Sequence, residues 1–251
     1  MSDSLLVVEN ISKHFGGLLA IDSASLHVKT GTITALIGPN GAGKTTLFSI
    51  ISGFLPADGG RVLYDGADIT TEPPHQRARR GIARTFQIVQ PFAGLTVREN
   101  IAIGSHLGQR GRPAALAAAN QVALAVGLGA QLEAPAATLT VAGSKRLELA
   151  RALAIAPRLL LLDEVLAGLN PSEIRDMVPV IRQLTARGMT ILMTEHVMQA
   201  VTALAEYVLV LAQGRIIARG TVQQVAANPL VVEAYLGAGA AARITAGSAH
   251  A

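Results

Sequence analysis

The chain has 251 residues, a length that fits one large domain or two small ones. Half of the residues are hydrophobic and only 15% are charged, against about 25% in an average soluble protein, so we expect large faces to be buried, some of them against another subunit. The absence of cysteine excludes disulfides, thiolate metal sites and a cysteine nucleophile, and the formal net charge of +4 is only a weak indication of a nucleic acid or an acidic membrane surface as partner.

No segment of the sequence has the pattern of a signal peptide or of a membrane-spanning helix. The N-terminal residues Met1 to Ser4 include no basic region, and no long apolar run follows them. The longest uncharged stretch lies between Arg112 and Glu133, and its length alone would suffice to cross a bilayer. It is mostly alanine and includes Asn120 and Gln121, so we expect a packed helical segment of a soluble protein.

The first third of the chain is predicted to be mainly β-structure. Partial alternation of apolar and polar residues indicates two strands joined by a turn at Gly16 and Gly17. A short run of apolar residues over 33–37 predicts a fully buried strand. The predicted strands are 5–15, 23–29, 33–37, 61–64 and 82–86, and the predicted helices are 44–55 and 75–80.

The composition changes near residue 88. From there to about residue 139 the chain is rich in Ala, Leu and Gly, which favours an inserted helical subdomain that we place over 88–156. Strands and helices then alternate, a pattern typical of a parallel sheet that helices cover on both faces. The predicted helices are 145–155, 171–187 and 197–205, and the predicted strands are 159–162, 189–194, 207–211 and 215–218.

We therefore predict one α/β domain over 5–236. Its core and its N-terminal β part comprise 5–87 and 157–236, with the helical subdomain inserted between them. The last residues, 237–251, are small and weakly apolar and are predicted to be a frayed tail.

A glycine-rich segment between a predicted strand and a predicted helix has the P-loop pattern, Gly-x-x-x-x-Gly-Lys-Thr. Its glycines allow several backbone N–H groups to point at one anion, and the helix N-terminus adds partial positive charge. Lys44 is predicted to reach the β- and γ-phosphates of a nucleotide, and the Thr45 hydroxyl to bind Mg²⁺. The alternative is a glycine-rich turn with a surface lysine. The predicted nucleotide-binding residues here are Gly38, Pro39, Asn40, Gly41, Ala42, Gly43, Lys44, Thr45 and Thr46.

Two carboxylates follow the apolar strand 159–162 directly. Ligands of α/β sheets bind at the carboxyl ends of the strands, so Asp163 and Glu164 are expected beside the P-loop. Asp163 suits an interaction with Mg²⁺ or its waters, and Glu164 suits a general base that polarises the attacking water. An acidic pair on the surface at a strand end is the alternative.

Three further residues are candidates because of their position. Gln87 follows a predicted strand, where its amide could bind Mg²⁺ and the attacking water, although such a side chain is often only solvated. His196 follows another strand and could hydrogen-bond the γ-phosphate, although a single histidine is more often structural. Phe15 stands beside a glycine turn and could stack on adenine; the alternative is a core aromatic.

Together and in this order, these residues resemble the ATP-binding subunit of an ABC transporter. The resemblance implies a P-loop NTPase core of the RecA type, an N-terminal antiparallel β subdomain and an inserted helical subdomain. It also implies ATP and Mg²⁺ as cofactors. The matching residues are Phe15 (A-loop), Gly38 to Thr46 (Walker A), Gln87 (Q-loop), Leu159 to Glu164 (Walker B), Ala167 to Asn170 (D-loop) and His196 (switch histidine).

Four segments are similar to the branched-chain amino acid uptake group of that family. They are Phe15 to Leu18, Gly81 to Gln87, Gly168 to Pro171 and Asn228 to Gly237. The resemblance implies a second, different ATP-binding subunit (a homodimer is the alternative), two membrane-spanning permease subunits and, indirectly, a periplasmic substrate-binding protein. Nucleic acid is not an expected partner. It also implies a peripheral location on the cytoplasmic face of the inner (plasma) membrane.

The chain departs from the family at its signature motif, usually Leu-Ser-Gly-Gly-Gln. Here the segment reads Leu139-Thr140-Val141-Ala142-Gly143, so that Thr140 keeps a hydroxyl expected to face ATP while Val141 and Ala142 add Cβ atoms where backbone should approach the γ-phosphate. Val165 also replaces a usual proline after the catalytic glutamate. Because each ATP lies between the P-loop of one subunit and the signature of the other, we expect a heterodimer with one strong site, at this chain's P-loop.

Two other functions stay open at this point. One is an ATP-binding regulatory subunit that hydrolyses poorly, which the altered signature keeps in view. The other is a soluble ABC-type ATPase that acts on nucleic acid or the ribosome. Such proteins usually carry long coiled-coil insertions or two ATPase halves, and this sequence has neither.

Overall fold

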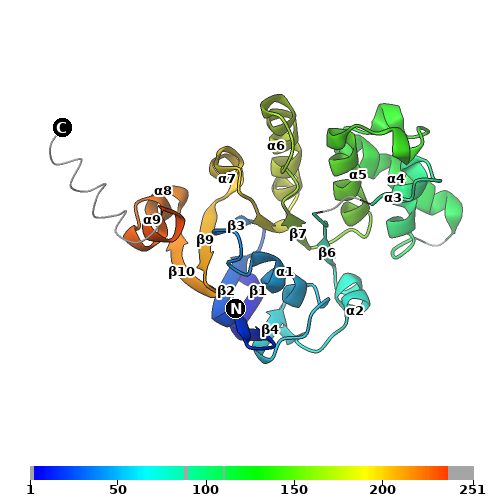
Figure 1. Cartoon of the computed structure of the whole chain (residues 1–251). Coiled ribbons are helices and arrows are strands. Elements are labelled where there is room, and N and C mark those ends of the chain that lie inside the picture. Colours follow the sequence, from blue (N-terminus) through cyan, green and yellow to red (C-terminus); the bar gives the residue numbers. More distant parts are fainter. Residues whose placement is uncertain (1–2, 88–89, 110, 237–251) are drawn as a thin grey trace, which may run out of the picture.

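The computed structural model describes residues 3–87, 90–109 and 111–236. Two β-sheets form the centre of the molecule, and three helices form a separate lobe beside them (Figure 1). The predicted tail, 237–251, lies outside the described residues, as does residue 88, the predicted start of the helical subdomain.

The first sheet is antiparallel and comes from the N-terminal part of the chain. Its strands lie in the order β2 (Leu18–Lys29), β1 (Ser4–Phe15), β4 (Gly59–Tyr64) and β5 (Ala67–Asp68). Gly16 and Gly17 form the predicted turn between β1 and β2. The second strand begins at Leu18 and not at residue 23, because pairing continues to the pair of Phe15 with Leu18.

The second sheet is parallel except at one edge. Its strands lie in the order β10 (Arg215–Gly220), β9 (Tyr207–Ala212), β3 (Ile33–Ile37), β8 (Thr190–Thr194), β7 (Leu159–Asp163) and β6 (Ile82–Arg84). Only β10 runs antiparallel to its neighbour. Every residue of β3, β7 and β8 is buried, as expected for parallel strands with both faces covered.

Hydrophobic residues on the two faces of this sheet belong to different cores. In β7, Leu160 and Leu162 pack with the helices of one face, whereas Leu159 and Leu161 pack with the antiparallel sheet and α1 (Lys44–Ile51) on the other. This alternation has the period of two expected for a strand. The continuous apolar run before Asp163 is therefore needed to fill both cores.

The remaining helices cover the second sheet or form the lobe. In the lobe, α3 (Val97–Ser105), α4 (Arg112–Ala125) and α5 (Val141–Leu153) pack together, with short 3₁₀ turns η1 (Gly129–Gln131) and η2 (Ala136–Thr138) between α4 and α5. The others are α2 (Pro74–Arg79), α6 (Pro171–Ala186), α7 (Met198–Leu204), α8 (Val222–Ala226) and α9 (Pro229–Leu236).

The long uncharged stretch after Arg112 is a packed helix, as predicted. Ala115, Ala119 and Ala123 recur every four residues along α4 and are fully buried against the lobe. None of the helices in the described part of the chain is both long and apolar enough to cross a membrane.

Further predicted boundaries were wrong, in two helices and one strand. The helix after the P-loop ends at Ile51 and not at residue 55, because Arg77 donates to the carbonyls of Ile50 and Ile51, both at 2.7 Å, and Gly53 turns with a φ of +81°. β6 ends at Arg84, two residues before the predicted end at residue 86. The helix predicted over 145–155 starts at Val141, because Thr140 caps it, and it ends at Leu153.

Candidate functional site

The P-loop connects β3 to α1 with a backbone that only glycine accommodates at two positions. Gly38 has a φ of +154°, and a Cβ atom there would lie 2.0 Å from the carbonyl oxygen of Leu211. Gly43 has a φ of +103°, and its Cβ would lie 2.6 Å from a methyl group of Ile21. The loop therefore packs closely against β2 and β9, in the glycine-dependent conformation that phosphate-binding loops use.

Lys44 is the first residue of α1 and points back into the loop. Its buried ammonium group donates to the carbonyl oxygens of Gly38, at 2.8 Å, and Pro39, at 3.0 Å. Burial lowers the pKa of Lys44, and the negative charges of Glu164 and Asp163 oppose that shift. The cation is thus placed at the mouth of the loop, where phosphate oxygens could replace the carbonyls as its partners.

The other loop residues divide between solvent and core. Asn40, Gly41 and Thr45 are exposed, Ala42 is buried, and the rest are half-buried. The Thr45 hydroxyl stands on the same side as Asp163 and Gln87, and these three residues line one groove of about 920 Å³ between the sheet and the helical lobe.

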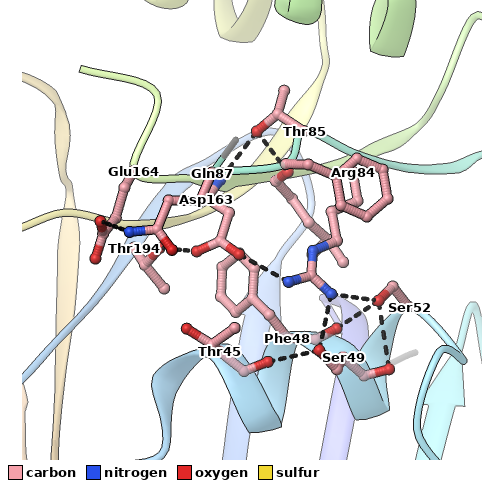
Figure 2. A network of polar contacts seen from close by, with 12 residues as sticks. Thr45, Phe48, Ser49, Ser52, Arg84, Thr85, Gln87, Asp163, Glu164 and Thr194 are labelled. Carbon is pink, nitrogen blue, oxygen red and sulfur yellow. Dashed lines mark hydrogen bonds and ion pairs between the residues drawn. The ribbon is translucent and has the colours of Figure 1, made fainter. Parts of the chain in front are cut away.

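Asp163 is held on both of its carboxylate oxygens (Figure 2). The Thr194 hydroxyl donates to Oδ1 at 2.7 Å, and the Arg84 guanidinium donates to Oδ2 at 2.7 Å. The Thr85 hydroxyl accepts the backbone N–H of Asp163 at 3.0 Å, which fixes the end of β7. A buried carboxylate needs such partners, because an unpaired charge is costly away from water.

Glu164 begins a strained turn directly after β7. Its φ is +49°, a left-handed conformation that costs a residue other than glycine about 1 kcal/mol or more. The Gln87 amide donates to its carboxylate at 2.8 Å, so two of the predicted catalytic residues are in contact (Figure 2). The buried Lys145 of α5 donates to the backbone oxygens of Gln87, at 3.3 Å, and Glu164, at 3.2 Å, and so stabilises their relative position.

The residues expected to bind Mg²⁺ have the chemistry that this ion prefers. Thr45, Gln87 and Asp163 offer a hydroxyl, an amide oxygen and a carboxylate, which are hard oxygen donors. The Gln87 nitrogen points at Glu164, which leaves its amide oxygen for another partner. The donor set therefore fits a Mg²⁺ ion that nucleotide phosphates would also bind.

The remaining predicted site residues lie around this group. His196 follows β8 with an exposed side chain, and β8 runs parallel to β7 with Thr194 opposite Asp163, so His196 and Glu164 leave the same edge of the sheet. Phe15 ends β1 and is 48% exposed, with the Lys13 ammonium 5.9 Å from its ring centre. An exposed ring of this kind is available for stacking.

The signature segment forms the N-terminus of α5. The Thr140 hydroxyl accepts the backbone N–H of Gly143 at 3.1 Å and so caps the helix. Val141 occupies the first helical position with its side chain 62% exposed. Val165, the other departure from the family, is buried in the core.

Sequence reasoning missed four residues that organise the site: Arg84, Lys145, Thr194 and Glu195. Arg84 and Thr194 are polar residues in apolar strands, and this was the available signal. Glu195 precedes His196 and is buried, and burial raises its pKa to about 7. Its Oε1 accepts the Leu166 N–H at 2.9 Å, whereas its buried Oε2 has no partner among the described residues.

The fold and this site together define a P-loop ATP-binding cassette. A family model described as "ABC transporter" matches residues 21–167, more than half of the chain. The chain belongs to the ABC transporter family, which confirms the resemblance inferred from its motifs. A second model, described as "Branched-chain amino acid ATP-binding cassette transporter", matches residues 215–241.

Curated relatives match over nearly their whole length. The chain is 37% identical to the high-affinity branched-chain amino acid transport ATP-binding protein BraF of Pseudomonas aeruginosa, over 94% of this chain and 99% of the relative. It is 38% identical to the probable branched-chain amino acid transport ATP-binding protein LivG of Archaeoglobus fulgidus, over 93% and 96%. LivG of Escherichia coli is 37% identical over 94% and 99%.

Solved structures confirm the fold class. The ADP conformation of MJ1267, an ATP-binding cassette of an ABC transporter, superposes with a TM-score of 0.86 at 34% identity, covering 94% of this chain and 100% of that one. A nucleotide-free cassette gives a TM-score of 0.85 at 34% identity, covering 92% and 98%. The P-loop core, the antiparallel sheet and the helices are therefore those of an ABC ATPase.

Proposed function

We propose that this chain is the ATP-hydrolysing subunit of an importer for branched-chain or closely related amino acids. The observation that carries the proposal is the similarity of nearly the whole chain to proteins named for that transport, together with the C-terminal match at residues 215–241. The transported solute itself would be selected by other subunits. Within the proposal, this chain supplies the energy and not the selectivity.

The arrangement of the site supports ATP hydrolysis at this chain's own P-loop. Residues 38–46 would bind the phosphates through backbone N–H groups and Lys44. Glu164 would act as general base on a water that Gln87 orients, and His196 would contact the γ-phosphate. Thr45, Asp163 and Gln87 would hold Mg²⁺, which supplies Lewis-acid stabilisation of phosphate charge when bound.

The proposed assembly contains a second ATP-binding subunit and two permease subunits. The groove that holds Gln87 is open toward the helical lobe and has exposed apolar side chains at Phe86, Phe92 and Ile103. Such a surface suits the docking of a permease helix. The assembly would place the chain on the cytoplasmic face of the inner membrane, and a periplasmic binding protein would deliver the solute.

The domain division predicted from the sequence is part of the same proposal. The core and β part, 5–87 and 157–236, would bind nucleotide, and the lobe within 88–156 would carry the signature to the partner. ATP binding would close the two subunits, and hydrolysis with product release would open them.

Reconstitution with the partner subunits tests this function. We expect ATP turnover by the complex to increase when a binding protein loaded with leucine, isoleucine or valine is added. Uptake of the same amino acids by cells should be lost on deletion of the gene and restored by it. No stimulation by any of the three amino acids would contradict the proposed transport role.

The same measurements separate the two alternatives. A regulatory subunit would bind ATP without contributing turnover in the complex. An ATPase that acts on nucleic acid would bind DNA or RNA with a strong dependence on salt concentration. The basic residues Arg77, Arg79, Arg80 and Arg84 give this second alternative little support. The side chains of Arg77 and Arg84 are buried and Arg80 pairs with Glu72, so that of these four mainly Arg79 is open to solvent.

A further inference from the structure

Arg84, the last residue of β6, lies at the centre of the polar network in Figure 2 although it was not among the predicted site residues. Its side chain is only 7% exposed and pairs with Asp163, whose side chain is 4% exposed. One guanidinium nitrogen donates to Asp163 at 2.7 Å. The other donates to the hydroxyls of Ser49 and Ser52, both at 3.1 Å.

The two hydrogen-bonding nitrogens of the Arg84 guanidinium connect two parts of the nucleotide site. Asp163 ends β7, whereas Ser49 belongs to α1 and Ser52 is its C-cap residue. The same helix begins with Lys44 and Thr45. One side chain therefore fixes the distance between the Asp163 carboxylate and the helix that presents the Thr45 hydroxyl. Lysine could not replace Arg84 fully, because an ammonium group does not have the several N–H donors that a planar guanidinium holds in a fixed arrangement.

The guanidinium group of Arg84 also lies close to two aromatic rings. Its carbon lies 5.9 Å from the ring centre of Phe48 in α1 and 5.4 Å from that of Phe86. Phe86 in turn meets Phe54 edge to face at 5.5 Å, and both rings are exposed in the groove. Arg84 therefore stands between the groove wall and the Asp163 carboxylate.

We propose that Arg84 is a positioning residue that fixes the Asp163 carboxylate relative to α1, so that Asp163 and Thr45 are placed for Mg²⁺ before the ion arrives. The aromatic contact with Phe86 holds the guanidinium in that place. A partner that moves Phe86 would therefore alter the metal site without touching it. The inference rests on the proposed roles of Asp163 and Thr45 toward Mg²⁺.

Calorimetric titration of the full chain with ADP tests this inference, because ADP is not hydrolysed. The quantity measured is the gain in ADP affinity when Mg²⁺ replaces EDTA. We expect Arg84→Met to reduce this gain about 10- to 100-fold, because loss of a residue that hydrogen-bonds a metal ligand usually has an effect of that size. The ADP affinity measured in EDTA should change little. Arg84→Lys should fall between Arg84→Met and the wild type.

Two further variants and a control complete the test. Replacing both Ser49 and Ser52 by Ala keeps the ion pair and removes its anchor on α1, and Phe86→Ala removes the ring from the groove side. Each should reduce the gain by a smaller factor, about two- to fivefold. Arg158→Met is the matched control, because Arg158 pairs with Asp65 at 2.6 Å on the surface.

The outcomes are distinct. A folded Arg84→Met protein with the wild-type gain would overturn the inference about Arg84. Should that variant not fold, an unchanged gain in the double serine variant would overturn it instead. If the wild type itself shows no gain with Mg²⁺, the proposed metal-binding roles of Thr45 and Asp163 fail first.

Discussion

The P-loop end and the signature end of this chain are built differently. At the P-loop end, the charged side chains of Lys44, Asp163 and Glu164 each have a hydrogen-bond partner within the chain, at 3.0 Å or less. At the signature end, Thr140 uses its hydroxyl to cap its own helix, and Val141 projects into solvent. The side chains of the chain's own nucleotide site thus hold one another in place, whereas the face that would serve a partner lacks the usual glycines.

The difference follows from what each end must bind. A P-loop encloses a phosphate from several sides, so its geometry is fixed by glycines and by buried partners. A signature approaches the same phosphate from across an interface with backbone N–H groups, and each added Cβ keeps that backbone further away. The comparison predicts that substitutions at the two ends affect two different ATP sites.

The largest expected effect is that of Glu164→Gln in the assembled complex. Loss of a general base usually costs about 10²- to 10⁴-fold in rate. If this chain's P-loop forms the strong site, the variant should abolish most phosphate release by the complex. Persistence of the activity, together with its loss on the equivalent change in the partner, would reverse the assignment of the strong site.

The second effect concerns Glu195, a buried carboxyl group whose charged neighbours include Glu164 and Lys145. In the fold its pKa is about 7, because burial disfavours the carboxylate, against a usual value of 4.5. The native state therefore keeps a proton that the unfolded chain releases, so this group lowers stability progressively as pH rises from about 4.5 to about 7. Above pH 7 the full cost, on the order of 3 kcal/mol, applies.

Glu195→Gln should remove this dependence, because the amide resembles the protonated acid. We expect its free energy of unfolding to exceed that of the wild type at pH 8 by up to about 3 kcal/mol and to be similar at pH 4.5. Urea unfolding at the two pH values measures both. The same substitution at the exposed Glu233 is the control. Equal stabilisation at both pH values would contradict the assigned protonation.

The third effect concerns Lys44 and nucleotide affinity. Lys44→Ala should weaken ATP binding about 10- to 100-fold, the usual loss for a charge-assisted hydrogen bond. Calorimetry with the Glu164→Gln background prevents hydrolysis during the titration. Lys29→Ala, at an exposed position at the end of β2, is the control. Unchanged affinity in the Lys44 variant would place the phosphates elsewhere.

The sequence was sufficient for those parts of the site whose geometry is local. The P-loop and the acidic pair each lie within a few consecutive residues at the end of an apolar strand. Because the strand, loop and helix follow from that short stretch, Lys44, Thr45, Asp163 and Glu164 could be placed on one edge of a sheet in advance. The fold class, which the structural neighbours confirm, followed from the same alternation of strands and helices.

The features that were missed depend on distant partners. Arg84 acts through Asp163, 79 residues away, and through Ser49, 35 residues away. The end of α1 is set by Arg77, 26 residues beyond Ile51. The start of α5 was missed for a local reason: Thr140 caps the helix, but Gly143 stands where a glutamate or glutamine would complete the usual capping pattern.

The smallest expected effect belongs to the signature end. Replacing Val141 and Ala142 by Gly should let the backbone at the start of α5 approach the partner's nucleotide. In a complex whose Glu164→Gln subunit does not hydrolyse ATP, the remaining turnover arises at the partner's P-loop. This turnover should increase about three- to tenfold, and a tenfold increase corresponds to about 1.4 kcal/mol of activation free energy.

Two glycines in a first helical turn also destabilise the helix, so a matched control is needed. Ala117→Gly, at an exposed position within α4, introduces a similar cost, about 1 kcal/mol, in the same lobe without approaching nucleotide. An increase in turnover confined to the Val141 and Ala142 variant would show that the Cβ atoms of these two residues lower ATP turnover at the partner's site. No increase would mean that the helical N-terminus already reaches the phosphate. The two ends would then differ in structure but not in how well they support ATP turnover.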